Sequence, residues 1–277
     1  MNKRSLFIVV GIMIIVLCGI GFWLLTQSPS LIKAQLVIDT GTVQVRHSDG
    51  AWVSANNGML LNQNDVVKTG DNTSASIILF ESSILRLDSN TEVTLQEIIQ
   101  QAETTDVKIW QDEGRTWNTI SRISGIDSYE IQTPVAVASV RGTSFYVHVW
   151  SNGKTTVGVG TGVVNVSLIK EYLVQNFTWL KKNESVTIDP EAPGQSLLIL
   201  PFVKDDWILQ NQQKDDQMRE NEKAALYKRL EPYIPQIKEQ YGIDDQEIEI
   251  LVDAYLDGDF ELPSDTPKWI RDIIEFS

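Results

Sequence analysis

The chain has 277 residues, of which 42% are hydrophobic and 22% are charged, and its formal net charge is −14. This composition is typical of a folded globular protein that is long enough for one large domain or two modest ones. An acidic surface repels phosphate backbones, which argues against nucleic acid as a partner. The single cysteine, Cys18, excludes an intrachain disulfide.

The amino-terminal segment is strongly apolar, with no charged residue between Leu6 and Leu25. Its length is roughly that of a helix that spans a bilayer, and Lys3 and Arg4 before it favour a cytoplasmic amino terminus. A cleaved signal peptide is the alternative, but its apolar region would be shorter, and no convincing cleavage site follows Leu25. We therefore predict that residues 1–30 are a single-pass anchor in the cell membrane. The bulk of the chain is then extracytoplasmic.

From Gln35 to about Ile188, short apolar alternations are interrupted by turn clusters. GTVQVRH, residues 41–47, alternates, whereas TGDNTS, residues 69–74, has the composition of a turn. Strands of about four to seven residues with turns every 8–12 residues indicate an all-β sandwich, roll or barrel-like module. No helical period separates these strands, so βαβ units are not expected. We predict a mainly β protein, with an all-β domain over residues 35–190.

Two short segments of this region resemble each other. Val43-Gln44-Val45 follows Gly41, and Val164-Asn165-Val166 follows Gly162. The similarity is too short to establish an internal repeat.

After a linker over residues 191–204, the sequence becomes acidic and predicts helices. Residues 205–230 are polar on all sides in their first half, which favours a solvent-exposed connecting helix. An apolar stripe begins at Ile248, preceded by a capping Asp244 or Asp245 and ended by Gly258. Thr266-Pro267 opens a last helix. We predict a small acidic helical region over residues 205–277.

The sequence contains no catalytic constellation that we recognise. His47 and His148 are far apart, and no Cys/His cluster has the spacing of metal ligands. No Gly-x-Ser-x-Gly elbow occurs. GVGTG, residues 158–162, lacks the Lys-Ser/Thr of a phosphate loop and lies between strands, so glycines that allow a bulge or a close approach are expected there. We expect no enzymatic activity, no metal and no cofactor.

A few polar or aromatic residues leave alternatives open. Asp65 ends a turn and begins a strand, where its carboxylate can accept backbone N–H groups, although ligand binding is also compatible with this position. Asp112 and Glu113 are expected at a solvated hairpin end. The β region has tryptophans that serve either as core residues or as stacking platforms for glycans: Trp52, Trp110, Trp117, Trp150 and Trp179.

The β region resembles the FecR-type domain family. One matching piece is NQNDVVKTGDNTSASIILFESSILRLDSNTEVTL, which contains Asp65, Thr69 and Gly70. The most specific piece is YEIQTPVAVASVRGTSF, residues 129–145, whose characteristic residues are Thr133, Pro134, Arg141, Gly142, Thr143 and Phe145. The pieces occur in the order of the family and cover about residues 35–190.

The resemblance implies an extracytoplasmic, all-β, non-enzymatic domain. In the best-known members, that domain belongs to a regulator that receives a signal from an outer-membrane receptor and controls a sigma factor through a cytoplasmic anti-sigma domain. Only about five residues precede the apolar segment here, so an anti-sigma domain is not expected. The predicted function is a membrane-anchored interaction or sensing module with a protein or envelope-polymer partner. The alternatives are a glycan-binding or structural envelope module and a regulatory subunit in trans-envelope signalling.

The pair Arg141-Gly142 is unusual within an apolar strand. Strict alternation would place Arg141 on the same face as Phe145 and Val147, where an unpaired guanidinium would cost several kcal/mol. A β-bulge at Gly142 would shift the phase, so that Ala138 and Val140 share the inner face with Phe145. Arg141 would then point outward and clamp turn carbonyls or a carboxylate such as Asp65.

Overall fold

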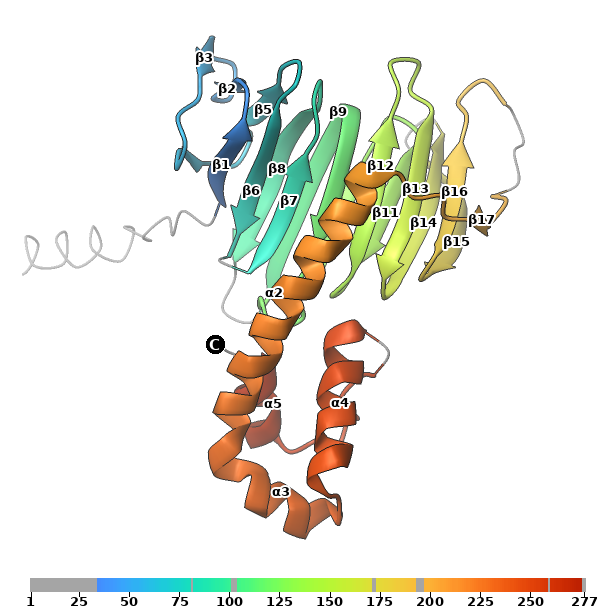
Figure 1. Ribbon diagram of the computed structural model, residues 1–277. Helices are drawn as coiled ribbons and strands as arrows, with labels where there is room; N and C mark the ends of the chain where they lie inside the picture. The colour runs from blue at the N-terminus through green and yellow to red at the C-terminus, as the bar shows by residue number, and fades with distance from the viewer. Residues whose placement is uncertain are drawn as a thin grey trace, which may run out of the picture. The chain divides into compact units, whose positions relative to one another are not determined.

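The computed structural model describes residues 34–80, 82–100, 104–170, 173–192, 197–258 and 260–275. All of these belong to one compact unit, Lys33–Ser277. Strands form its first part and helices follow, as predicted (Figure 1). The predicted anchor from Leu6 to Leu25 lies outside the described residues. Within the described ranges, no helix has both the length and the apolar character needed to cross a membrane.

The strands form two antiparallel layers that share one long strand, β9 (Thr105–Thr119). In sheet A the order is β4-β1-β6-β7-β9-β12-β13-β16-β17. Besides β9 it contains β1 (Ala34–Thr40), β4 (Leu60–Leu61), β6 (Ser74–Leu79), β7 (Ser83–Leu87), β12 (Ser144–Val149), β13 (Thr155–Thr161), β16 (Glu184–Ile188) and β17 (Leu200–Pro201). β17 lies in the segment predicted as a linker.

In sheet B the order is β3-β2-β5-β8-β9-β10-β11-β14-β15, and only the β9–β10 pair is parallel. Besides β9 it contains β2 (Val43–Arg46), β3 (Trp52–Ser54), β5 (Val66–Thr69), β8 (Glu92–Gln100), β10 (Ser128–Gln132), β11 (Ala136–Val140), β14 (Val163–Lys170) and β15 (Leu173–Lys181). The amino-terminal half of β9 pairs in sheet B and its carboxyl-terminal half pairs in sheet A. The predicted hairpin at Asp112 and Glu113 is therefore wrong, because β9 continues through that point.

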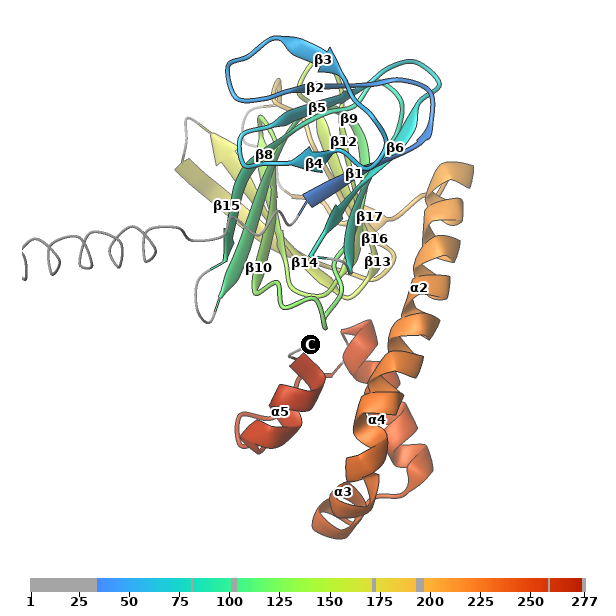
Figure 2. The same ribbon diagram turned by 90° about the vertical axis from the view of Figure 1, so that its left-hand side faces the viewer.

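The core lies between the two sheets (Figure 2). Because side chains alternate along a strand, each sheet contributes every second residue to it. Ala138 and Val140 of β11 are buried there, and so are Phe145 and Val147 of β12. This agrees with the predicted set of inner residues, but the predicted bulge is wrong. β11 belongs to sheet B and β12 to sheet A, so the chain changes sheets at residues 141–143.

The helical part begins with α2 (Asp206–Leu230), followed by the 3-10 turn η1 (Glu231–Tyr233) and α3 (Ile234–Tyr241). α4 (Asp245–Asp257) and α5 (Lys268–Glu275) complete it. Asp244 forms a capping box with Glu247 at the start of α4. Gly258 ends this helix with a φ of 80°, a left-handed conformation that glycine adopts without strain.

The first half of α2 is not exposed on all sides, which corrects the prediction of a solvated connecting helix. α2 contacts the outer face of sheet A at β9 and β12 (Figure 1). Ile208 of α2 packs there with Trp117, Tyr146 and Phe202. The second half of α2 joins α3, α4 and α5 in a separate apolar cluster.

The glycines of residues 158–162 make room for this packing. A Cβ atom on Gly158 would collide with the Phe202 ring, and one on Gly160 would collide with Trp117. Both glycines lie in β13, so close approach to aromatic side chains explains the motif, as the strand interpretation predicted.

Candidate functional site

At three places of the described chain where strands change sheets, a glycine and a threonine form the same kind of contact, which we call a joint. At each, a glycine with positive φ faces a buried threonine on the neighbouring crossing. The pairs are Gly41 (φ 77°) with Thr73, Gly114 (φ 88°) with Thr91, and Gly162 (φ 70°) with Thr143. A Cβ atom on any of these glycines would collide with the threonine hydroxyl, so the crossing requires glycine.

The threonine hydroxyl links the two crossing chains at each joint. Thr42 N donates to Thr73 Oγ1 over 3.0 Å, and Arg115 N donates to Thr91 Oγ1 over 3.0 Å. Thr143 Oγ1 donates to the carbonyl of Val163 over 3.2 Å. The threonine itself is buried in each case, so its hydroxyl forms a hydrogen bond between the two crossing chains and is not left unpaired in the interior.

The residue before each threonine has a left-handed conformation. It is Asn72 (φ 49°), Asn90 (φ 55°) or Gly142 (φ 64°), and asparagine and glycine are the residues that tolerate it best. The similarity of the segments after Gly41 and Gly162 therefore reflects a repeated structural element, in which a strand of sheet A continues into sheet B.

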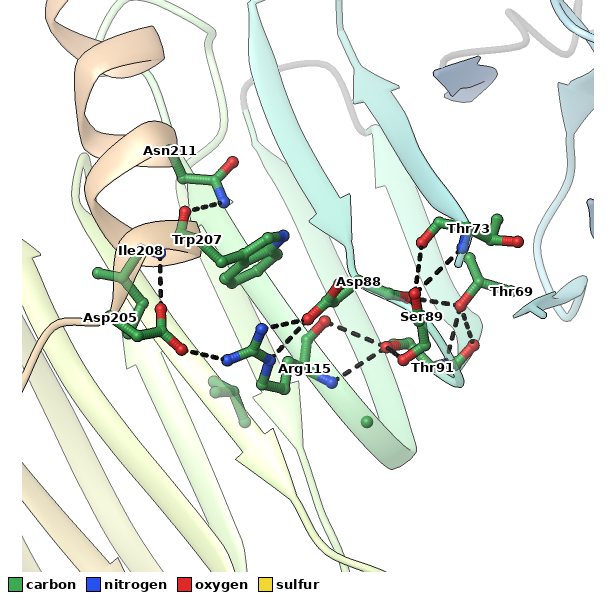
Figure 3. Close-up of polar contacts among 12 residues, drawn as sticks. Thr69, Thr73, Asp88, Ser89, Thr91, Arg115, Asp205, Trp207, Ile208 and Asn211 are labelled. Carbon is green, nitrogen blue, oxygen red and sulfur yellow. Dashed lines mark hydrogen bonds and ion pairs between the residues drawn. The ribbon is translucent and has the colours of Figure 1, made fainter. Parts of the chain in front are cut away.

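Two of these corner loops lie side by side (Figure 3). Thr69 Oγ1 donates to the carbonyl of Asp88 over 2.6 Å and accepts from Thr91 N over 2.9 Å. Ser89 Oγ donates to the carbonyl of Thr73 and accepts from its N–H, both over 3.1 Å. The backbone N–H of Gly70 donates to the carbonyl of Thr42, and its carbonyl accepts from Asn90 N. Thr69 and Gly70 thus lie within the architecture of the corner.

Thr133 and Pro134 lie in the turn between β10 and β11. Thr133 Oγ1 accepts from Ala136 N over 3.0 Å and from the hydroxyl of Thr155 over 3.2 Å. Pro134 is exposed at the tip of the turn. Phe145 is fully buried and lies edge-on to Tyr129, with 6.2 Å between ring centroids.

Asp65 has a turn function and does not contact Arg141. Its carboxylate accepts from Asn62 N over 2.8 Å and pairs with His47 Nδ1 over 2.9 Å. Arg141 is exposed and makes no hydrogen bond or ion pair with any described residue. The predicted clamp is therefore wrong: Arg141 points outward as expected, but the corner is held by Gly142 and Thr143.

Three other arginines connect the β-sandwich to the helices, and Arg115 is the first. It directly follows the joint at Gly114, and its Nε donates to Asp88 Oδ2 over 2.7 Å. Its Nη1 donates to Asp205 Oδ2 over 2.5 Å, while Asp205 Oδ1 caps α2 at Ile208 N (Figure 3). Burial lowers the pKa of Arg115, but hydrogen bonds to Asp88 and Asp205 outweigh it and raise the pKa, so the guanidinium stays charged. Trp207 lies 4.8 Å from this guanidinium.

Arg86 forms the second and most buried connection. Its Nη1 donates to Asp215 Oδ1 of α2 over 2.6 Å, and the two side chains are 8% and 11% exposed. Asp215 also accepts from Trp117 Nε1 and from the hydroxyl of Thr119, both over 2.7 Å. Because a buried carboxylate needs several donors, this network compensates the desolvation of both charges.

Arg122 forms the third connection, between Gly142 and the segment after α4. It donates to the carbonyl of Phe260 over 3.0 Å and to Glu261 Oε1 over 2.6 Å, and its guanidinium lies 5.4 Å from the Tyr255 ring. A Cβ atom on Gly142 would collide with the Arg122 side chain. Gly142 therefore allows both the corner and the passage of Arg122 above it.

Burial shifts the pKa values of several groups at this interface. It raises the pKa of Tyr146 to about 12. It lowers the pKa of His148 to about 4, helped by the charge of Arg115, so this imidazole is neutral at pH 7. Burial also raises the pKa of Glu222 to about 7, assisted by the nearby charge of Asp215. Glu222 lines a small cavity of about 40 Å³ together with Ser121, Gly142 and Thr143.

Residues 65–165 match the family model of the FecR protein. The chain contains a FecR domain. Two complete joints and the connecting arginines Arg86, Arg115 and Arg122 lie within the match, whereas their helical partners lie outside it. The helices are thus held by residues of the FecR domain itself.

Two solved structures resemble part of this chain. They are crystal structures, at 1.65 Å and 2.50 Å resolution, of a candidate anti-sigma factor from Parabacteroides distasonis ATCC 8503. Each is 18% identical, with a TM-score of 0.40, over 52% of this chain and 62% of that one. The match therefore spans less than two thirds of the related structure. No functionally curated protein matches this chain significantly.

The connecting arginines were not singled out from the sequence, although one of them carried a usable signal. Arg86 stands between Leu85 and Leu87 of β7, which are both buried, so a charged residue is unusual at that position. Its partner Asp215 lies 129 residues away in the sequence. In the described part of the chain, no three His, Cys, Asp or Glu side chains cluster as metal ligands would.

The tryptophans of the β region divide between the two roles considered. Trp117 is fully buried on the outer face of sheet A. Trp179 is 57% exposed, and Trp52 and Trp150 are each 38% exposed. Core filling therefore describes Trp117 but not these three.

Proposed function

We propose that this protein is a non-catalytic interaction or sensing module in which the FecR domain is the scaffold and the acidic helices present the partner-binding surface. The apolar segment from Leu6 to Leu25 anchors it in the cell membrane with the bulk of the chain extracytoplasmic. The anchor and this orientation rest on the sequence alone.

The connection between the FecR domain and the helices carries the proposal. Arg86, Arg115 and Arg122 each hold a carboxylate of the helical part, at Asp215, Asp205 and Glu261 respectively. Ion pairs contribute little net stability compared with apolar packing, both when they are buried, as at Asp215, and when the carboxylate is exposed, as at Asp205 and Glu261. Their directional hydrogen bonds instead favour one orientation of the helices on sheet A, which suits a surface that must be recognised by a partner.

Partner capture from solubilised membranes tests the proposal. We expect the full chain to retain a partner and a variant without residues 231–275 to lose it, because α3, α4 and α5 are then absent. A second variant, Asp216→Asn, alters an exposed carboxylate of α2 and should retain the partner. Equal capture after separate deletion of the β-sandwich and of the helices would disprove the proposal.

Binding of an envelope glycan is a second candidate, because Trp52, Trp150 and Trp179 are exposed enough for stacking. Retention on isolated envelope polysaccharide can be compared between the full chain and its Trp→Ala variants. Glycan binding predicts a loss at one or more of these positions. Unchanged retention in all three variants would exclude stacking by these tryptophans.

A further inference from the structure

The helical part contains an apolar groove of about 320 Å³. Every helix from α2 to α5 contributes to its walls, through residues such as Leu230, Ile237, Val252 and Ile270. Ligand pockets in proteins are usually about 300–1,000 Å³ and mostly apolar. The groove therefore has the size and lining of a site that receives apolar groups.

The groove is open to solvent. Two of its lining residues, Tyr241 and Leu251, are 47% and 37% exposed. Leaving apolar surface in water costs about 25 cal/mol per Å² relative to burying it. An apolar occupant that covers these residues would recover this free energy.

Acidic residues surround the lining. Between residues 231 and 275 the chain has thirteen acidic and only three basic residues. Glu247 precedes Leu251 by one helical turn, and Asp265 precedes the lining residue Thr266. Both carboxylates are exposed, so they create a negative field at the edge of the groove.

We propose that this groove binds a basic amphipathic helix of a partner protein. Such a helix inserts apolar side chains at helical spacing into a groove and leaves Lys and Arg at its sides, where the acidic edge attracts them. The same acidic edge repels the carboxylate of a fatty acid and a second copy of this acidic chain. The inference rests on the proposed function and specifies the chemistry of its partner.

A designed peptide probes the groove directly. It has about 18 residues, with leucines at positions i, i+3, i+4 and i+7 and lysines elsewhere. Its controls are a scrambled peptide without an apolar face and an acidic version with Glu in place of Lys. Fluorescence anisotropy of the labelled peptides is measured with the full chain in phosphatidylcholine nanodiscs, and empty nanodiscs supply the baseline.

Two neighbouring substitutions form a matched pair. Leu251→Gln changes a lining residue, whereas Ile250→Gln changes an adjacent residue of α4 that is 57% exposed and does not line the groove. We expect Leu251→Gln to weaken peptide binding by at least about tenfold and Ile250→Gln to leave it unchanged. Melting curves verify that both variants are folded.

Several results would overturn the inference. They are equal binding of the scrambled or acidic peptide, equal effects of the two substitutions, preferential binding of palmitate, and self-association that depends on Leu251. The outcome is separable from the proposed function. If the peptide does not bind but partner capture still depends on residues 231–275, the groove is rejected and the proposed function stands. If partner capture does not depend on these residues, the proposed function itself is rejected.

Discussion

The outer faces of the two sheets differ sharply although both belong to one sandwich. On sheet A, Trp117 is fully buried beneath α2, and Arg86 pairs with Asp215. On sheet B, Phe177 and Trp179 of β15 are 60% and 57% exposed. Both faces are built from alternating strands with aromatic and charged residues on the outside. The pattern within a strand therefore does not decide which face is covered; that depends on a helix distant in the sequence.

The two tryptophans test this difference most strongly. Trp117→Ala should lower the free energy of unfolding by about 3–5 kcal/mol, because it removes a buried aromatic ring and a donor to Asp215. Trp179→Ala should change it by less than about 0.5 kcal/mol. Chemical denaturation of both variants measures the contrast. Equal effects would mean that α2 does not cover sheet A in solution.

The buried carboxylate gives the next largest expected effect. Asp215→Asn leaves the Arg86 guanidinium buried without its counter-charge, which should cost about 3 kcal/mol of unfolding free energy. Asp216→Asn, in the adjacent exposed position, should cost less than about 0.5 kcal/mol. Denaturation curves again provide the measurement, and a mild effect of Asp215→Asn would show that the Arg86 connection is solvated.

The two residues of the pair Arg141-Gly142 should differ in their effect on stability, because Gly142 lies in the corner and Arg141 lies on the surface. Gly142→Ala should destabilise the protein by about 2 kcal/mol, because it combines a positive φ with a collision against Arg122. Arg141→Lys should be nearly neutral, since Arg141 is exposed and has no partner among the described residues. The melting temperatures of the two variants should rank in this order. A larger loss for Arg141→Lys would restore the arginine clamp.

Glu222 of α2 should make the free energy of unfolding depend on pH, and no such effect is expected from the uncovered face of sheet B. Burial raises its pKa to about 7 in the folded state, against an ordinary 4.5. The folded state therefore holds a proton that the unfolded chain releases, so this contribution is present below pH 4.5 and is lost as the pH rises to about 7. Relative to Glu222→Gln, the wild type should lose at most ~1.4 kcal/mol per pH unit in this interval. Parallel pH profiles of the two proteins would contradict the prediction.

Much of the local structure was predictable, because it depends on neighbouring residues. Alternation and turn clusters indicated the short strands, and Asp244 and Gly258 marked the ends of α4. The positive φ of Gly142 also followed from its place in an apolar run. Its cause did not, because a bulge and a change of sheet both relieve the same conflict between Arg141 and the inner face.

The connecting arginines show where local reasoning ends. Arg86 and Arg141 have similar sequence surroundings, but only Arg86 has a carboxylate from α2 above it. Gly142 after Arg141 marks a change in backbone direction, but nothing within a few residues of Arg86 indicates its distant carboxylate partner. The groove of the helical part has the same origin, since its walls come from residues of α2, α3, α4 and α5.

The sequence by itself determined a mainly β domain of short strands, the helices that follow it, the acidic charge and the FecR signature, because each depends on periodicity, backbone conformation or composition within short segments. Only the tertiary structure decided that α2 covers sheet A and that Arg86 is buried while Arg141 is exposed. It also decided that three glycine–threonine pairs form the corners of the β-sandwich. The physical reason is that burial and charge pairing depend on which distant segments meet in space.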